Sequence, residues 1–233
     1  MKMWKRALGI LISGAILCSS MVGNFAFAAE EQEHVSTWDA QWIWDDDSTA
    51  RNTWMDFRKT VELTEVPEKA EARLAVDSRY WLYINGELVV FEGGLKRGPT
   101  PEDGYYDVVD IAPYLKTGTN TIAVKAWYWG PKDQYASYSN YSSKKAGFLF
   151  EAQIGDQLVI SDDSWKVKRD EAYLDDTKIA GVGQPNYRIP AYNIYYDARK
   201  TEDTGWEEPG YDVRSEEHTS ELQSPFYLVC RLL

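Results

Sequence analysis

Aromatic side chains are the residues of this sequence with the clearest chemical potential, and that potential is for binding. They make up 14% of the 233 residues, and one group is close together in the sequence: Trp127, Trp129, Tyr135, Tyr138 and Tyr141. A flat indole or phenol face can stack on the apolar face of a sugar ring, while nearby hydroxyl and amide groups bond its hydroxyls. We therefore predict carbohydrate contact by these five side chains. The alternative is that either Trp127 or Tyr128 points into the core and the tyrosines pack against another domain.

Arg97 is a second candidate binding residue. It follows the diglycine Gly93-Gly94 in a segment that we expect to project from the fold as a loop. A guanidinium group can bond sugar hydroxyls or hold a carboxylate with two parallel hydrogen bonds. The competing interpretation is a structural loop or a contact with a neighbouring domain.

Three consecutive carboxylates, Asp45, Asp46 and Asp47, are the candidate metal ligands. Calcium takes six to eight oxygen ligands, so an acidic loop of this kind is a place where Ca²⁺ could bind. The spacing matches no known calcium loop, and acidic runs are commonly only solvated. We expect no required cofactor, with calcium as the ion to test.

The residue inventory excludes several classes of catalyst. The cysteines are Cys18 and Cys230 and the histidines are His34 and His218, all near the two ends of the chain. No serine–histidine triad, two-histidine metal site or disulfide framework can be assembled from them. Glycoside hydrolysis instead needs two carboxyl groups about 5–9.5 Å apart, but no carboxylate motif of that type stands out. We predict no catalytic residue in this sequence.

The first 28 residues have the pattern of a secretory signal peptide. Lys2, Lys5 and Arg6 precede an apolar run over residues 7–22, and Ala26 and Ala28 supply the small residues of a cleavage site. The run is short for a membrane span, which needs about 20 residues. We expect export, an extracellular location, and no membrane contact after cleavage.

The last twenty residues have a different origin in our interpretation. Residues 214–223 read Arg-Ser-Glu-Glu-His-Thr-Ser-Glu-Leu-Gln, an in-frame translation of a nucleotide sequence that resembles a common short-read library adapter. We therefore predict that residues 214–233 are a sequencing artefact that does not fold, and that the natural protein continues past Val213.

The charge of the chain argues against one class of partner. The formal net charge is −12, and it becomes −14 once the +3 of residues 1–28 and the −1 of residues 214–233 are left out. An acidic surface of this kind repels phosphate backbones, so we expect no nucleic acid partner.

Short strands with regular turn signals predict an all-β fold. Residues 53–63 alternate apolar and polar side chains, which places Met55 and Phe57 on a buried face and Asp56 and Arg58 on a wet one. Asn85-Gly86 joins residues 80–84 and 87–91 as a tight hairpin turn. Further strands are expected at residues 70–76, 105–109, 121–129, 147–154, 157–160 and 165–168. Together these strands and turns predict one antiparallel two-sheet β-sandwich of jelly-roll type over residues 38–212. Residues 203–212 are expected to be a connector.

An ordered set of short motifs resembles one family. The segments are Trp42-Ile43-Trp44, residues 57–63, residues 77–87, Arg97-Gly98-Pro99, Tyr105-Tyr106-Asp107, residues 110–115 and residues 161–167. In this order they resemble the β-sandwich domain that precedes the catalytic barrel in bacterial α-L-rhamnosidase-like glycoside hydrolases. The resemblance implies a catalytic acid and base in a downstream (α/α)₆ barrel, a sandwich that buttresses it, and rhamnose and calcium binding in some related modules. No motif of the catalytic residues is matched here.

Two functional hypotheses follow. The first is a non-catalytic N-terminal domain of a secreted α-L-rhamnosidase-like glycoside hydrolase acting on plant or microbial glycans. Its partners would be carbohydrate and a downstream catalytic domain of the same chain. The alternative is a self-sufficient carbohydrate-binding module of a secreted or cell-wall protein. Sugar specificity, linkage and oligomeric state are not encoded in any recognisable motif.

Overall fold

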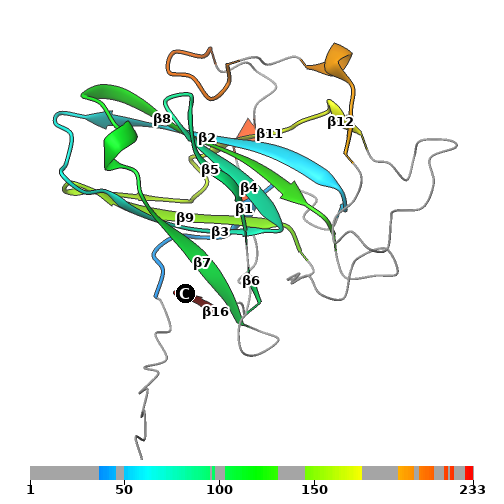
Figure 1. Cartoon of the computed structure of the whole chain (residues 1–233), viewed down its shortest axis with the longest axis horizontal. Coiled ribbons are helices and arrows are strands. Elements are labelled where there is room, and N and C mark those ends of the chain that lie inside the picture. The colour runs from blue at the N-terminus through cyan, green and yellow to red at the C-terminus, as the bar shows by residue number, and fades with distance from the viewer. Residues whose placement is uncertain are drawn as a thin grey trace, which may run out of the picture. The chain divides into compact units, whose positions relative to one another are not determined.

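A computed structural model describes residues 37–45, 50–94, 96–97, 103–130, 145–174, 194–201, 205–212, 218–219, 221–222 and 229–232. The regular structure of these residues is almost entirely β-strand, and the strands form two larger sheets and one two-stranded ribbon. Figure 1 shows the two larger sheets lying face to face. The predicted all-β, two-sheet sandwich is therefore confirmed, and its jelly-roll connectivity stays a prediction.

The first sheet, sheet A, is built around β9 (Gly147–Ile154) and β3 (Glu71–Asp77). Its strand order is β15-β1-β9-β3-β7-β16, with β10 added beside β9 and β6 beside β7. The other strands of sheet A are β1 (Ile43–Trp44), β6 (Lys96–Arg97), β7 (Asp103–Asp110), β10 (Gln157–Ile160), β15 (Glu221–Leu222) and β16 (Val229–Leu232). All of its pairings are antiparallel except that of β16 with β7.

The second sheet, sheet B, is centred on the pairing of β2 (Thr53–Leu63) with β8 (Gly118–Tyr128). Its order is β14-β11-β2-β8-β4-β5. The flanking strands are β4 (Arg79–Ile84), β5 (Glu87–Gly93), β11 (Lys166–Arg169) and β14 (His218–Thr219). The ribbon pairs β12 (Tyr173–Leu174) with β13 (Tyr195–Tyr196), and the 3₁₀ helices η1 (Ala112–Tyr114) and η3 (Ala198–Lys200) complete the described elements. Within these ranges no helix is long and apolar enough to cross a membrane.

The core lies between the two sheets and is rich in aromatic rings. Phe57 of sheet B contacts Phe148 of sheet A with ring centroids 4.8 Å apart, and Phe148 meets Trp165 at 5.1 Å. Trp44 and Tyr128 are fully buried beside them. The predicted alternation in residues 53–63 is confirmed on this side, because Met55, Phe57, Val61 and Leu63 all belong to the core. Burial of such large rings is the main source of stability for a sandwich of this size.

The predicted Asn85-Gly86 hairpin is present between β4 and β5. Both residues have positive φ, 53° and 84°, as the tight turn requires. The Asn85 side chain also ties the hairpin to the rest of sheet B. Its Nδ2 donates to Tyr114 O at 2.9 Å and to Asn120 Oδ1 at 2.8 Å, and its Oδ1 accepts from Thr121 N at 3.0 Å.

Three short strands lie within residues 214–233. The structure places β14, β15 and β16 in this segment, paired with β11, β1 and β7 respectively. Strands at a sheet edge carry unpaired N–H and C=O groups, so an extended segment can join them whatever its origin. The proposed origin of this segment in adapter sequence remains a prediction.

Replacing Asn85 should destabilise the domain. In Asn85→Ala, three hydrogen bonds are lost and alanine tolerates positive φ less well, so we expect a loss of about 2–3 kcal/mol in unfolding free energy. Urea denaturation followed by circular dichroism measures it. The control is Asp156→Ala, at the exposed tip of the β9–β10 hairpin, which should change stability by less than about 0.5 kcal/mol. Equal losses in the two variants would contradict the special role of Asn85.

Candidate functional site

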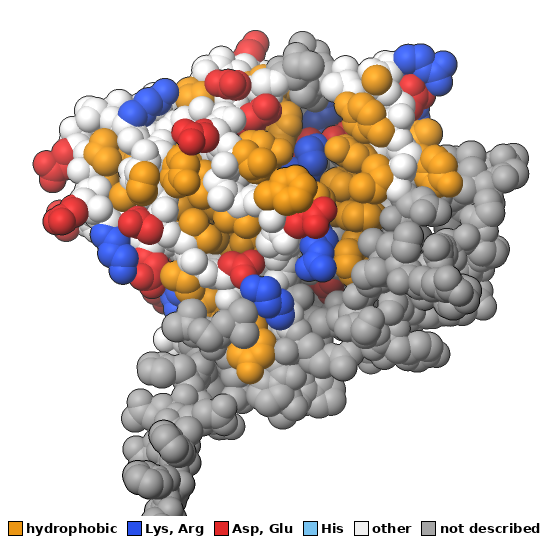
Figure 2. Space-filling model, in the orientation of Figure 1, with side chains coloured by type: hydrophobic (Ala, Val, Ile, Leu, Met, Phe, Trp, Pro, Cys, Tyr) orange, Lys and Arg blue, Asp and Glu red, His pale blue; other side chains and the backbone are white. Residues whose placement is uncertain are grey.

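The outer face of sheet B carries rows of aromatic and charged side chains on neighbouring strands. The strand register puts Trp54, Trp127 and Arg79 opposite one another across β2, β8 and β4. The next row on the same face holds Asp56, Lys125 and Trp81. Directly opposite side chains on neighbouring strands interact, so this pattern creates an aromatic row beside a charged row. On the face drawn in Figure 2, hydrophobic side chains gather in patches with acidic and basic side chains between them.

The aromatic row forms a tryptophan cluster, which we define as Trp54, Trp81, Trp127 and Trp129 together with Tyr173. Trp54 lies at its centre and is only 4% exposed. Its ring stacks with Tyr173 at 3.9 Å, with Trp127 at 4.6 Å and with Trp81 at 5.3 Å between centroids. Tyr173 comes from β12, far from the other four in sequence, so the cluster holds the segment after β11 against sheet B.

The charged row centres on Lys125, an ammonium group between two carboxylates. Its Nζ lies 2.7 Å from Asp56 Oδ1 and donates to Asp170 Oδ2 at 2.5 Å. Burial alone would lower the pKa of Lys125, but Asp56 and Asp170 outweigh that effect and hold the pKa above its usual value. Burial raises the pKa of Asp56 to about 6, although Lys125 opposes this shift. The three groups bind one another, and the rings of Tyr173 and Trp206 lie 5.2 and 5.4 Å from Lys125 Nζ.

Arg58 fastens residues 205–212 to the same face. Its Nη1 donates to the backbone carbonyls of Trp206 and, at 3.0 Å, of Glu208, and its guanidinium group lies 5.5 Å from the Tyr211 ring centroid. Asp56 and Arg58 were expected on a wet face, and the structure corrects this: Arg58 is only 6% exposed because residues 205–212 cover it. The alternation of a strand predicts that Arg58 points away from the core. It does not predict that a distant segment, residues 205–212, covers that side chain.

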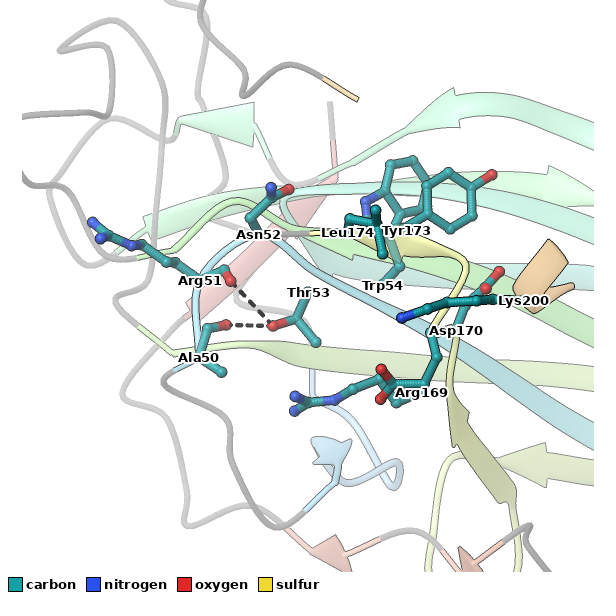
Figure 3. Close-up of a pocket in the computed structure, with 11 residues that line it drawn as sticks. Ala50, Arg51, Asn52, Thr53, Trp54, Arg169, Asp170, Tyr173, Leu174 and Lys200 are labelled. Atoms are coloured by element: carbon teal, nitrogen blue, oxygen red, sulfur yellow. Dashed lines mark hydrogen bonds between the residues drawn. The ribbon is translucent and has the colours of Figure 1, made fainter. Parts of the chain in front are cut away.

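A cleft opens at the end of this face beside the tryptophan cluster. Its volume is about 530 Å³, and it is lined by residues 50–54, residues 169–171, Tyr173, Leu174 and Lys200 of η3. Figure 3 shows Trp54 and Tyr173 stacked along one side of the cleft, with Arg169, Asp170 and Lys200 nearby and Arg51 on the opposite side. Volumes of roughly 300–1,000 Å³ are typical of small-ligand sites, so this cleft is the candidate binding site among the described residues.

The predicted aromatic binding residues are partly located. Trp127 and Trp129 both belong to the tryptophan cluster and are 5% and 7% exposed, with Trp127 Nε1 donating to Asn52 Oδ1 at 2.9 Å. Tyr128 faces the opposite way and is fully buried in the core, as the alternation of a strand requires. Tyr135, Tyr138 and Tyr141 lie outside the described residues. The sugar-binding role of this group stays a prediction.

The remaining candidates are separate from the tryptophan cluster. Arg97 lies on β6, where it pairs with Gly104 of β7. The Asp45 carboxylate accepts a hydrogen bond from Arg169 Nη2 at 2.9 Å, while Asp46 and Asp47 lie outside the described residues. Within the part of the chain that the structure describes, no group of three or more acidic, histidine or cysteine side chains could hold a metal ion. Calcium binding by the Asp45 to Asp47 run is therefore still a prediction.

Sequence reasoning missed the residues that build this face from separate segments. Lys125 alternates with buried residues on β8 and could have been read as one more solvated lysine. Trp54 and Trp81 occupy strand positions facing outward, and an outward tryptophan is the one available signal that something covers that face. Tyr173, Asp170 and Lys200 carried no signal, because their partners are distant in sequence.

The fold and this covered face define a β-sandwich domain. On this face Lys125 and Arg58 bind segments that are distant in the sequence. The model of the family described as "Alpha-L-rhamnosidase N-terminal domain" matches residues 65–231. This chain belongs to that family.

Solved structures agree with the family. The GH78 rhamnosidase of Bacillus sp. GL1 is similar with a TM-score of 0.68 and 26% identity, over 84% of this chain and 20% of that one. The α-L-rhamnosidase of Aspergillus terreus shares the fold with a TM-score of 0.60 and 20% identity, over 82% of this chain and 22% of that one. The chain thus spans about a fifth of the length of these rhamnosidases. A comparison with curated proteins found no match.

Removing Lys125 should be strongly destabilising. Lys125→Ala leaves Asp56 and Asp170 facing each other without their shared cation, so we expect a loss of about 3–5 kcal/mol at pH 7. Chemical denaturation gives the value. The matched control is Lys69→Ala, which breaks the exposed pair with Glu71 and should leave the stability nearly unchanged. A loss for Lys125→Ala as small as that of the control would contradict the buried network.

Asp56 should make stability depend on pH. Its pKa is raised to about 6 in the folded state from 3.8, so the folded state binds more protons than the unfolded state between these values. The contribution of Asp56 is fully present below about pH 4 and is lost as the pH rises through about 6, by at most about 3 kcal/mol. Asp56→Asn should therefore flatten the stability profile between pH 4 and 7, measured by denaturation at several pH values. An unchanged profile would show that Asp56 keeps an ordinary pKa.

Proposed function

We propose that this chain is the non-catalytic N-terminal β-sandwich domain of a secreted α-L-rhamnosidase-like glycoside hydrolase that acts on plant or microbial glycans. The catalytic barrel would belong to the same, longer protein. The observation that carries the proposal is the family match over residues 65–231, together with coverage of only about a fifth of the similar rhamnosidases. A general acid and a second carboxylate of the barrel would then cleave the glycosidic bond.

The state of the ordered carboxylates supports a non-catalytic role. Asp56 and Asp170 share Lys125, and Glu151 pairs with Arg73 while accepting the backbone N–H of Asp39 at 2.8 Å. Asp107 accepts from the Tyr80 hydroxyl at 2.9 Å and pairs with Lys96. A hydrolytic pair needs one protonated carboxyl group and one free carboxylate facing an open substrate site. These four carboxylates are instead bound to internal cations, a hydroxyl and a backbone amide.

The covered outer face of sheet B suggests what the domain contributes. Arg58, the Lys125 network and the tryptophan cluster hold residues 170–174 and 205–212 firmly on the sandwich. Such a domain would give a neighbouring catalytic domain a rigid support. Residues 205–212 would act as the predicted connector and fix the direction in which the chain leaves.

The alternative function, a self-sufficient carbohydrate-binding module, is favoured by one observation. The cleft of about 530 Å³ has the size of a saccharide site, and the half-buried ring of Tyr173 lines it. The two functions are compatible, because a supporting domain can also hold part of the substrate. They differ in whether a hydrolase domain follows.

Activity assays on the chain and on the extended gene should separate these functions. We expect the purified chain to release no product from an aryl α-L-rhamnoside above the buffer rate, because no catalytic motif is matched and Asp56, Asp170, Glu151 and Asp107 are bound internally. The rhamnosidase of Bacillus sp. GL1 serves as the positive control. Resequencing across the codon for Val213 should reveal a long helical region with clustered acidic residues, and that longer protein should hydrolyse the substrate.

Two results would overturn the proposal. Hydrolysis by the purified chain itself would show that it is catalytic. A restored reading frame that ends within a few codons of Val213 would leave no room for a barrel and would favour the separate binding module.

A further inference from the structure

We propose that the cleft beside the tryptophan cluster is a binding site for a carboxylated saccharide, a uronate. Arg169 and Lys200 would hold the carboxylate, and Tyr173, held in place by its stacking on Trp54, would face the sugar ring. The choice of a saccharide as ligand rests on the proposed function. The choice of an acidic one rests on the charges that line the cleft.

Tertiary structure brings the cleft together from segments far apart in the chain. Thr53 and Trp54 begin β2, Arg169 ends β11, and Tyr173 belongs to the ribbon strand β12. Lys200 arrives from η3, where Asp197 caps the short helix by accepting from Arg199 N at 3.2 Å. The opposing walls are therefore held by sheet B, by the tryptophan cluster and by a capped turn. Such a cleft is largely formed before any ligand binds, which lowers the entropic cost of binding.

Lys200 is the first of two cations available to a ligand. It lines the cleft, and among the described residues its ammonium group takes part in no hydrogen bond or ion pair. Asp170 also lines the cleft, but its carboxylate is already satisfied by Lys125 at 2.5 Å and by Ala172 N at 3.0 Å. The charge of Asp170 is thus balanced from the side of sheet B. Glu171 is exposed and supplies an acceptor for sugar hydroxyls.

Arg169 is the second cation, and only part of its guanidinium group is used. Its Nη2 donates to Asp45 at 2.9 Å, which fixes the orientation of the side chain. The structure records no partner for its Nε and Nη1 among the described residues, and the side chain is 39% exposed. A guanidinium group presents five donors in a planar fork that matches the geometry of a carboxylate. Arg51 adds further positive charge to the lining, in a chain whose net charge is −12.

The shape of the site favours a sugar acid over a bare anion. A volume of about 530 Å³ far exceeds the space that an inorganic ion needs. Tyr173, which is half-buried, stacks on the buried ring of Trp54 with the ring planes 12° apart, so Tyr173 is the ring of this pair that a ligand in the cleft could contact. Sugar rings pack against aromatic walls through their C–H faces, whereas a small anion gains nothing from them. The combination of the Tyr173 ring with the cations Lys200 and Arg169 is what a uronate would use.

Calorimetric titration of the purified chain tests the site. The probes are galacturonate and its di- and trisaccharides, the matching neutral galactose compounds, and inorganic phosphate, each at low and high salt. We expect the acidic saccharides to bind at least about tenfold more tightly than the neutral ones and than phosphate, and to weaken as salt screens the cations. Binding that does not distinguish acidic from neutral saccharides, or phosphate that binds as tightly as the uronates, would overturn the proposal.

Variants locate the site. Lys200→Glu should abolish uronate binding and Lys200→Ala should weaken it about tenfold, while Lys69→Ala, a remote exposed lysine, should leave it unchanged. Arg169→Lys keeps the charge but loses the fork, so it should reduce the preference for uronate over phosphate. Unchanged melting temperatures would show that these variants fold. Uronate binding that survives Lys200→Glu would place the ligand elsewhere and contradict the inference.

The outcomes stay separate from those of the proposed function. If the extended protein hydrolyses rhamnosides but the chain does not bind uronates, only the inferred uronate site is contradicted. If the chain binds uronates but no hydrolase region follows, only the proposed function fails.

Discussion

The pairing of β2 with β8 is the constraint on which the rest of the structure depends. The ladder runs from Thr53 opposite Tyr128 to Leu63 opposite Gly118 without interruption. Side chains alternate across a sheet, so this one register decides that Phe57 enters the core and that Trp54 faces outward beside Trp127. A slip of one residue would exchange the two faces. It would expose the rings of the core and bury the charged row.

The outward side of this ladder is covered at the end that holds Trp54, Arg58 and Trp127, by a different kind of interaction from that of the core. Stacked indole and phenol rings adjoin a lysine held between two carboxylates, and Arg58 donates to backbone carbonyls of a returning segment. An ion pair in such a setting contributes little beyond its desolvation cost, but loss of one partner is expensive. The charged row therefore specifies where residues 170–174 and 205–212 lie more than it adds net stability. That positioning also creates the cleft, because Lys200 and Tyr173 reach it only when these segments are in place.

A domain organised in this way suits a supporting role within a larger glycoside hydrolase. Asp56 and Asp170 are bound to Lys125, and the cleft beside them is lined by cations, by Tyr173 and by the acidic side chains of Asp170 and Glu171. Substrate contact and mechanical support then use the same face. A domain that fixes residues 205–212 in place and binds a charged saccharide in its cleft would help to align a polymer with the catalytic region. This alignment is part of the proposal above and not of the family assignment.

The sequence by itself determined the class of fold and much of the local structure. The two-residue period of residues 53–63 predicts β2, and Asn85-Gly86 predicts its hairpin, because alternation and tolerance of positive φ are local properties. Only the tertiary structure decided that Arg58 is buried, that Lys125 links Asp56 to Asp170, and that a cleft forms beside Trp54. Each of these depends on segments more than forty positions apart, and the desolvation that makes a charge significant exists only after those segments meet.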